Sequence, residues 1–299
     1  MQRGIVAGLT AYLIWGLFPL YWPLLEPAGA LEILAHRMVW SLVVMALLVT
    51  GLRQWRAIVS MPPRVWLLVI AAAVLIAINW ALYIWAVNNG HVVEAALGYY
   101  INPLVSVVLG VLVFAERLRL LQWIAVGLGA GAVAVIAVGG GSVPFVAIGL
   151  AVTFGTYGLV KKVVPLQPTE SLTAEGLVLV VPAVSYLVVL QVTGTSTLTG
   201  HGTGHVLLLL TTGLVTVGPL LAFAAAARAL PLSILGLLQY ITPTVQFLLG
   251  VLYFDEQMPP ARWIGFGLVW AALAVLTTDA LRRRRGATRP RASAQVSGP

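Results

Sequence analysis

Cysteine is absent from the 299-residue sequence, and acidic residues are scarce, with nine Asp and Glu against 17 Lys and Arg. The lack of cysteine excludes a disulfide framework, a thiolate metal site and a cysteine nucleophile. Charged residues make up only 9% of the chain, whereas a soluble domain has about 25%. Apolar residues account for 60% of the length, and the mean hydropathy is +0.99. This composition predicts an all-α integral membrane protein.

Ten apolar runs are long enough, at roughly 20 residues each, to cross a bilayer as helices. Only brief turns separate these runs, so we expect no soluble domain. The arginine-rich residues 282–299 cannot bury a core and are predicted to form a disordered cytoplasmic tail. The predicted spans lie near residues 4–24, 33–50, 66–87, 93–115, 121–139, 143–160, 172–193, 204–227, 233–254 and 261–281.

The basic residues predict the orientation of these spans. With a cytoplasmic N-terminus and ten spans, 15 of the 17 Lys and Arg lie in cytoplasmic segments, and only Arg37 and Arg262 lie on the outer side. Membrane proteins carry such an excess of positive charge on the cytoplasmic side. We therefore expect a multi-pass protein of the cell inner membrane with both termini cytoplasmic. Lys161 and Lys162 also support the short span at 143–160, because without it both would lie outside.

The sequence contains an internal duplication with a shift of 140 residues. Residues 100–135 align with 240–275 without a gap, with 17 identities in 36 positions, including Gly110 with Gly250 and Trp123 with Trp263. The chain is therefore predicted to hold two five-helix repeats, at 1–140 and 141–281. Because five is odd, the second repeat enters the membrane in the opposite orientation, as in carriers that alternate their access.

Pro103 and Pro243 are equivalent in the two repeats and lie inside predicted spans. A proline in a helix removes one backbone hydrogen bond and kinks or breaks the helix. Each follows a polar residue, Asn102 or Thr242. We therefore predict a symmetric pair of helix breaks. In the fifth span, Gly127 and Gly131 are spaced for close helix packing.

Several strings resemble the RarD branch of the EamA family, in the drug/metabolite transporter superfamily. They are "GLTAYLIWGLFPLYW" in the first span, "EILAHRMVWS" in the second, "NWALYIWAVNNGHVVEAALGYYINPLVSVVLG" through the third and fourth, and "GTYGLVKK" in the sixth. The resemblance covers all the spans and leaves out only the tail. It implies a ten-helix inner-membrane carrier that exports small metabolites or drugs, with its site between the two halves.

Arg37 is the main candidate for substrate binding, because ionisable groups inside spans are costly and point to function. It lies a few residues inside the second span, near the outer end, after His36. One interpretation is that Arg37 extends to the outer interface and His36 caps it. The other is that Arg37 faces a central cavity as counter-ion to an anionic substrate, with Trp40 beside it. An arginine on the outer side runs against the usual charge bias and favours the cavity.

Glu116 and Glu256 are equivalent in the repeats and end the fourth and ninth spans. Each could be structural, pairing with an arginine of a neighbouring turn such as Arg117 or Arg262. Each could also couple transport to protons, because a partly buried carboxylate can titrate near neutral pH. The sequence leaves both roles open.

Aromatic and amide side chains within the spans form a larger candidate set. Ligand cavities have mainly apolar and aromatic walls with a few placed polar groups. Asn79 and Tyr83 are four residues apart and share one helix face. Besides His36, Arg37 and Trp40, the predicted substrate-binding residues are Tyr12, Trp15, Asn79, Trp80, Tyr83, Tyr99, Tyr100, Asn102, Tyr157, Gln239, Tyr240 and Gln246.

The expected partners are a small-molecule substrate and the lipid bilayer, with protons as one candidate coupling ion. Nucleic acid is not expected, because the basic residues lie between apolar segments instead of on one soluble face. The four histidines are scattered, so we expect no metal, and no motif indicates a cofactor or an enzyme. The sequence favours a secondary exporter. A facilitator or channel, a membrane-embedded enzyme and a non-transporting sensor are the alternatives.

Overall fold

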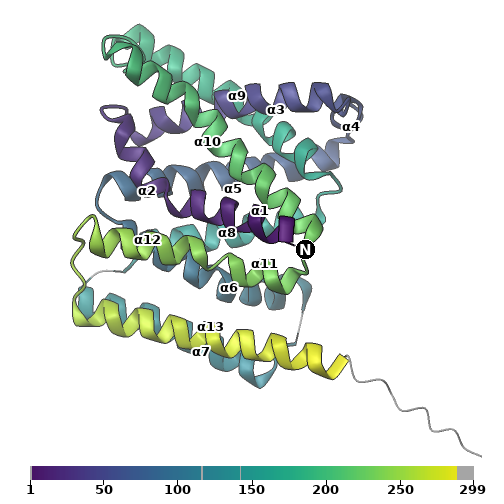
Figure 1. The fold of residues 1–299 in the computed structure, drawn as a ribbon, viewed down its shortest axis with the longest axis vertical. Helices are drawn as coiled ribbons and strands as arrows, with labels where there is room; N and C mark the ends of the chain where they lie inside the picture. Colours follow the sequence, from purple (N-terminus) through teal and green to yellow (C-terminus); the bar gives the residue numbers. More distant parts are fainter. Residues whose placement is uncertain (1, 116, 142, 288–299) are drawn as a thin grey trace, which may run out of the picture. The chain divides into compact units, whose positions relative to one another are not determined.

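The structure, a computed structural model, describes residues 2–115, 117–141 and 143–287 (Figure 1). In these residues every regular element is a helix, and no strand occurs. Among the described residues, nine helical segments are long and apolar enough to cross a membrane, and one of them, Ile234–Leu252, contains a short interruption. A tenth candidate is formed by helices bent by 45°. These candidates agree with the ten predicted spans, including the short one that begins near residue 143.

The first half of the chain holds five candidate spans. The bent first span consists of α1, which is followed after one residue by α2 and the 3-10 helix η1. Pro19 and Pro23 lie at the starts of α2 and η1, where a missing N–H costs no helical hydrogen bond. The bounds are α1 Gln2–Gly16, α2 Phe18–Tyr21, η1 Trp22–Leu25, α3 Ala30–Gly51, α4 Trp55–Val59, α5 Pro63–Asn88, α6 Val92–Phe114 and α7 Leu120–Gly140.

The second half follows the same plan, except that its fourth span is divided. The bounds are α8 Phe145–Val163, α9 Pro168–Thr193, α10 Gly202–Ala229, α11 Leu232–Leu238, α12 Ile241–Leu252 and α13 Pro260–Ala287. A residue with left-handed backbone follows the fourth span of each half, Ala115 with φ 52° and Asp255 with φ 50°. These two residues are 140 apart, so the duplication extends to the backbone of this turn.

The described chain forms two compact units, whose boundaries differ from those of the repeats. Unit 1 contains residues 1–106 and 144–258, and unit 2 contains residues 107–143 and 259–299. Each unit therefore combines helices from both halves of the sequence. The boundary between the repeats at residue 140 is therefore a feature of the sequence, and it does not separate the two compact units.

Unit 1 packs through close helix approaches at glycine. On α10, Gly213 lies against α3 so closely that an added Cβ would be 2.5 Å from the Trp40 carbonyl. On α9, Gly176 faces Leu42 of α3, and on α1, Gly4 faces Ala229 of α10. Helix α3 is thus held between α9 and α10. This packing brings the second spans of the two repeats side by side.

Unit 2 is dominated by the pair α7 and α13, which lie side by side (Figure 1). Their close approaches are at Gly139 against Ala261 and at Gly265 against Ile136. Gly127 and Gly131 have open space where a Cβ would be. The prediction that these two glycines mediate close packing is therefore wrong. The face of α7 that meets α13 carries Ala132, Ile136 and Gly139, and Gly127 and Gly131 lie beside that face.

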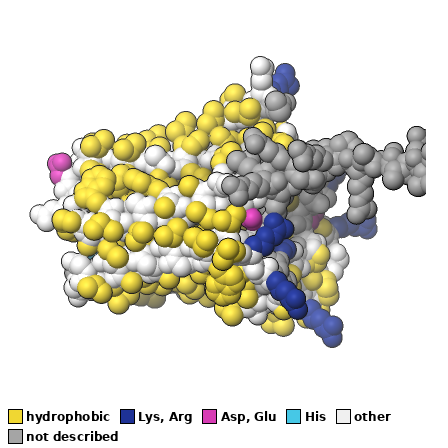
Figure 2. All heavy atoms as spheres, turned by 90° about the horizontal axis from the view of Figure 1, so that it is seen from below, with side chains coloured by type: hydrophobic (Ala, Val, Ile, Leu, Met, Phe, Trp, Pro, Cys, Tyr) yellow, Lys and Arg dark blue, Asp and Glu magenta, His cyan; other side chains and the backbone are white. Residues whose placement is uncertain are grey.

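The outward surface of the spans is apolar. Leu67 on α5 and Val181 on α9 are each 67% exposed, as expected for side chains that contact lipid instead of water. Figure 2 shows hydrophobic side chains covering the face in view along the length of the helices. Together with the helix lengths, this surface identifies an integral membrane protein.

The two repeat-equivalent prolines differ in their local structure. Pro103 lies inside α6, which continues through it without interruption. Pro243 lies at the start of α12, and Gln239 and Tyr240 separate α12 from α11. The predicted symmetric pair of breaks is thus an interruption in one repeat only. At Pro243 the missing N–H falls in the first turn of a new helix, where it costs least.

Helix α13 extends beyond the last predicted span. It ends at Ala287, so residues 282–287 are helical where a disordered tail was predicted. Arginine has a high helix propensity, and no glycine or proline precedes Gly286 in this stretch. Residues 288–299 lie outside the described residues.

Candidate functional site

Arg37 lies in the interior of unit 1, with only 3% of its surface exposed. Its Nε donates a hydrogen bond of 2.8 Å to Oγ1 of Thr216 on α10. The guanidinium carbon is 3.7 Å from the ring centroid of Trp80 on α5 and 5.2 Å from that of Trp22 on η1. These are cation–π distances. Arg37 therefore does not extend to the interface as a snorkelling side chain would.

No described residue neutralises this buried cation. No carboxylate among the described residues lies within ion-pair distance of Arg37. One terminal guanidinium nitrogen is also buried without a hydrogen-bond partner. Burying an unpaired charge is expensive, and cation–π contacts offset only part of the cost. The arrangement has an unused donor and an uncompensated positive charge, both suited to an anion.

Two of the side chains that contact Arg37 also line a small cavity of about 40 Å³ between α3, α5, α9 and α10. This volume holds a few water molecules, but is far below the 300 to 1,000 Å³ of a ligand pocket. The walls are mostly apolar. The lining residues are Met38, Ser41, Leu42, Met45, Ile76, Trp80, Leu172, Glu175, Gly176, Leu179, Thr216, Val217 and Leu220.

The cavity is built from equivalent positions of the two repeats. Thr216 and Leu220 follow Ile76 and Trp80 by 140 residues, and all four line it. Another equivalent pair, Tyr100 and Tyr240, stack with ring centroids 6.5 Å apart. Equivalent residues meet only near the axis that relates two repeats. The cavity therefore lies at the pseudo-symmetry axis of the duplication.

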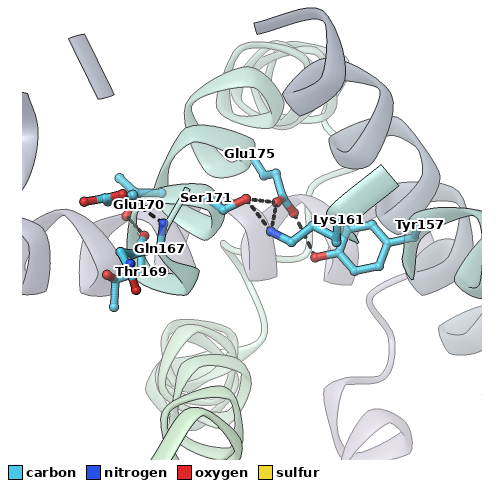
Figure 3. Close-up of polar contacts among 8 residues, drawn as sticks. Tyr157, Lys161, Gln167, Thr169, Glu170, Ser171 and Glu175 are labelled. Atoms are coloured by element: carbon cyan, nitrogen blue, oxygen red, sulfur yellow. Dashed lines mark hydrogen bonds and ion pairs between the residues drawn. The ribbon is translucent and has the colours of Figure 1, made fainter. Parts of the chain in front are cut away.

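Glu175 on α9 also lines the cavity and carries a dense set of polar contacts (Figure 3). It is 3% exposed. Its carboxylate accepts hydrogen bonds from Lys161 Nζ at 2.6 Å, Ser171 Oγ at 2.9 Å and Tyr157 OH at 3.1 Å. Lys161 also donates to Ser171. Glu175 is thus a buried carboxylate whose charge is balanced by Lys161 of α8.

Sequence reasoning did not identify Glu175 or Lys161 as site residues, although it did include Tyr157. A signal was present, because Glu175 lies inside the predicted span 172–193. A second signal comes from the helix starts: Arg37 is the eighth residue of α3, and Glu175 is the eighth residue of α9. The ungapped shift of 140 conceals this match, because it pairs Arg37 with Leu177.

Part of the predicted aromatic and amide set forms two hydrogen-bonded groups, which are joined by the ring contact of Tyr83 with Tyr99. Gln246 on α12 donates to the Trp15 carbonyl at 3.2 Å and to Tyr83 OH at 2.8 Å. Tyr83 packs against Tyr99, whose hydroxyl donates to Asn79 Oδ1 at 3.4 Å. Asn79 in turn donates to the Leu150 carbonyl and to Thr153 of α8. These side chains connect α1, α5, α6, α8 and α12.

Other predicted residues make contacts elsewhere in unit 1. Tyr12 packs on Trp15 and Phe223, and its hydroxyl donates to the Leu235 carbonyl at 3.4 Å. Tyr100 shares a hydrogen bond of 2.6 Å with Thr244, in addition to its stacking on Tyr240. These contacts join α1 and α6 to the divided span α11–α12.

Four predicted residues take no part in the cavity lining or in these hydrogen-bond and ring contacts. His36 is 2% exposed, and neither ring nitrogen has a hydrogen-bond partner. Trp40 Nε1 and Asn102 Oδ1 are likewise buried without partners. Gln239 is exposed in the interruption between α11 and α12. Of the predicted substrate-binding residues, Trp80 alone is among the residues that line the cavity. Arg37 does not line it but contacts two residues that do, Trp80 and Thr216.

Glu256 sits at the N-terminus of α6. Its carboxylate oxygens accept the backbone N–H groups of Val92 at 2.5 Å and Val93 at 2.9 Å. The first N–H groups of a helix lack partners within the helix, so this carboxylate satisfies two of them and complements the helix dipole. This geometry supports the structural role of Glu256, and proton coupling stays a prediction. Its equivalent, Glu116, lies outside the described residues.

No group of three or more His, Asp or Glu that could hold a metal occurs in the part of the chain that the structure describes. The polar groups near the cavity are instead an arginine, a threonine and the Glu175–Lys161 pair. This set is suited to binding a solute through charge and hydrogen bonds.

Comparison with protein families identifies the fold. The model of the EamA-like transporter family matches residues 2–138 and again residues 142–278. The chain belongs to the EamA-like transporter family. The two EamA matches coincide with the duplication seen in the sequence, and each contains five candidate spans.

Curated EamA relatives cover nearly the whole chain. "Protein RarD" of Streptomyces exfoliatus is 56% identical over 100% of this chain and 94% of its own length. "Protein RarD" of Escherichia coli (strain K12) is 41% identical over 95% of this chain and 97% of its own length. An "Uncharacterized transporter" of Vibrio cholerae is 43% identical over 97% of both chains. These matches confirm the resemblance to the RarD branch and indicate a membrane transporter.

A solved crystal structure has the same fold. It superposes with a TM-score of 0.60 over 94% of this chain and 99% of that chain, at 19% identity. The EamA arrangement of helices is therefore seen in an experimental structure. At this level of identity the likeness concerns the fold alone.

Proposed function

We propose that this protein is a secondary exporter of the inner membrane that carries a small monoanionic solute by alternating access. The observation that carries the proposal is the buried guanidinium of Arg37, which has an unused donor and no carboxylate partner. A protein gains nothing from burying such a charge unless a ligand completes it. Arg37 and Thr216 bind the anionic group, and Trp80 and the apolar walls contact the body of the solute.

The small volume of the cavity and the repeats support a carrier over a channel. A channel needs a continuous wet path, whereas the cavity between α3, α5, α9 and α10 holds only a few waters. Repeats 1–140 and 141–281, inserted in opposite orientations, provide two similar structures that can exchange conformations around one central site. Such an exchange opens the cavity to each side in turn. The remaining aromatic and amide residues position the helices around it.

The first test is flux in liposomes that contain only the purified protein. We expect uptake of labelled benzenesulfonate and benzoate above that of protein-free liposomes, and no uptake of neutral benzamide above that background. Benzenesulfonate is a permanent anion, so its uptake cannot arise from passage of a neutral acid through the lipid. Uptake of benzamide at the same rate as the anions, or no uptake of any of the three, would contradict the proposal.

The orientation is tested with topology reporters. The distribution of Lys and Arg predicts that both termini, and the tail after residue 281, lie in the cytoplasm. Fusions after residue 60 and at residue 290 are expected to report the cytoplasm, and a fusion near residue 198 the outer side. A C-terminus on the outer side would remove the case for repeats of opposite orientation.

A further inference from the structure

Three ionisable groups of unit 1 lie near the cavity, and two of them are positive and one is negative when all are charged. Arg37 on α3 is a single positive charge without a partner. Glu175, which lines the cavity, forms an ion pair of 2.6 Å with Lys161 of α8. Glu175 is the only ionisable residue among those that line the cavity. If each group is charged, the sum around the cavity is one positive charge.

Arg37 and Glu175 occupy similar places in their repeats. Each is the eighth residue of the second span in its repeat, and each rests on the first span of its own repeat. Arg37 lies against Trp22 and Phe18, which are aromatic and leave its charge uncompensated. Glu175 contacts Tyr157 and Lys161, and the lysine compensates it. The second span thus carries an uncompensated charge in one repeat and a neutralised charge in the other.

The Lys161–Glu175 pair is held by several hydrogen bonds. The Glu175 carboxylate accepts hydrogen bonds from Lys161, Ser171 and Tyr157. The Lys161 side chain is 24% exposed, against 4% for Glu175, so the ammonium keeps some contact with the surface. Lys161 is in the last turn of α8, near the predicted cytoplasmic end. The partner that balances Glu175 is therefore fixed in place by the fold.

From this balance we infer that the Lys161–Glu175 pair fixes the cavity at one net positive charge, and so selects monoanions and makes their export electrogenic. The inference rests on the proposed function. A bound monoanion makes the cavity neutral, and the empty carrier returns with one positive charge, so each cycle moves one negative charge outward. An inside-negative membrane potential drives that movement without a coupled proton.

The test uses the full chain in liposomes with equal pH on both sides and a potassium potential set by valinomycin. Wild type is expected to accumulate benzenesulfonate toward the positive side by about tenfold for each 59 mV. Uptake that ignores the potential would overturn the inference. That result differs from failure of the proposed function, in which wild type shows no anion uptake under any condition.

Charge variants of the pair separate charge from structure. Lys161→Met leaves the cavity with no net charge, and is expected to lower benzenesulfonate uptake by about tenfold. Glu175→Gln leaves two positive charges, and is expected to raise uptake of 1,3-benzenedisulfonate relative to benzenesulfonate by about tenfold. The double variant Lys161→Met/Glu175→Gln restores one positive charge and is expected to recover potential-driven uptake of benzenesulfonate.

The double variant is the decisive comparison, because it removes the ion pair but keeps the sum of charges. Size-exclusion profiles and melting temperatures establish that each variant is folded. A folded double variant that stays as impaired as Lys161→Met would show that the pair acts through its geometry. Equal uptake and equal selectivity in wild type and both single variants would show that the pair has no part in transport.

Discussion

Replacing Arg37 by glutamine is expected to reduce transport of a monoanion by about one hundredfold, a loss that corresponds to roughly 2.7 kcal/mol of anion binding. The free energy of unfolding is expected to stay the same or to rise, because the substitution removes a buried charge that has no carboxylate partner. A residue that only stabilises the fold would change both quantities in the same direction. Flux in liposomes and thermal unfolding in detergent measure the two effects.

The conservative variant Arg37→Lys separates the charge from the shape of the group. Lysine keeps the positive charge but loses the planar fork and the stacking on Trp80. We expect an intermediate loss of about tenfold, which corresponds to about 1.4 kcal/mol. Arg56→Lys is the matched control, because Arg56 is exposed on α4. Wild-type flux in Arg37→Gln at equal protein levels would remove Arg37 from the transport site.

The second large effect is expected at Gly213. An added Cβ at this position would lie 2.5 Å from both the carbonyl carbon and the oxygen of Trp40, so α10 and α3 would have to separate. We expect Gly213→Ala to lower the free energy of unfolding by about 1 to 3 kcal/mol, as overpacking does. Transport should fall as well, because separation of these helices lengthens the 2.8 Å bond between Arg37 and Thr216.

Gly204 on the same helix provides the control. No side chain and no other helix lies within 4 Å of a Cβ added there, and the residue is exposed. Because alanine favours helix over glycine by up to about 1 kcal/mol, Gly204→Ala is expected to leave stability unchanged or raise it. Thermal unfolding in the same detergent shows whether each alanine variant is more or less stable than wild type. A Gly213→Ala protein as stable as Gly204→Ala would contradict the close approach of α3 and α10.

The candidate site was only partly accessible from the sequence. Arg37 stood out for two reasons. Ionisable residues are rare inside membrane spans, and arginine is less common on the outer side of the membrane. Glu175 carried a similar signal but is neutralised by Lys161, and a lysine near the end of a span looks like an ordinary cytoplasmic anchor. The aromatic and amide set was chosen by residue type, which does not specify the direction of a side chain. Hydrogen bonds such as that of Gln246 with Tyr83 depend on how the spans pack.

The two repeat-equivalent prolines also show what the sequence does not specify. Pro103 and Pro243 are chemically equivalent in the sequence, yet α6 is continuous and the second copy is divided at Gln239 and Tyr240. Proline removes one hydrogen bond in both places. Whether the helix then continues depends on neighbouring contacts, such as the 2.8 Å hydrogen bond from Thr242 to the Tyr12 carbonyl. The aligned sequence contains the proline but not this contact.

The sequence by itself determined the class of protein, the spans, the duplication and the family. These follow from composition, run length and local identity, because a bilayer requires long apolar helices whatever their packing. Only the tertiary structure decided which charges are paired and which positions share a cavity. Arg37, Glu175 and Thr216 are far apart in the chain, and α3, α9 and α10 bring them together through close glycine contacts. In hydrophobic spans many helix faces are equally apolar, so the pattern of residues does not specify which face meets which neighbour.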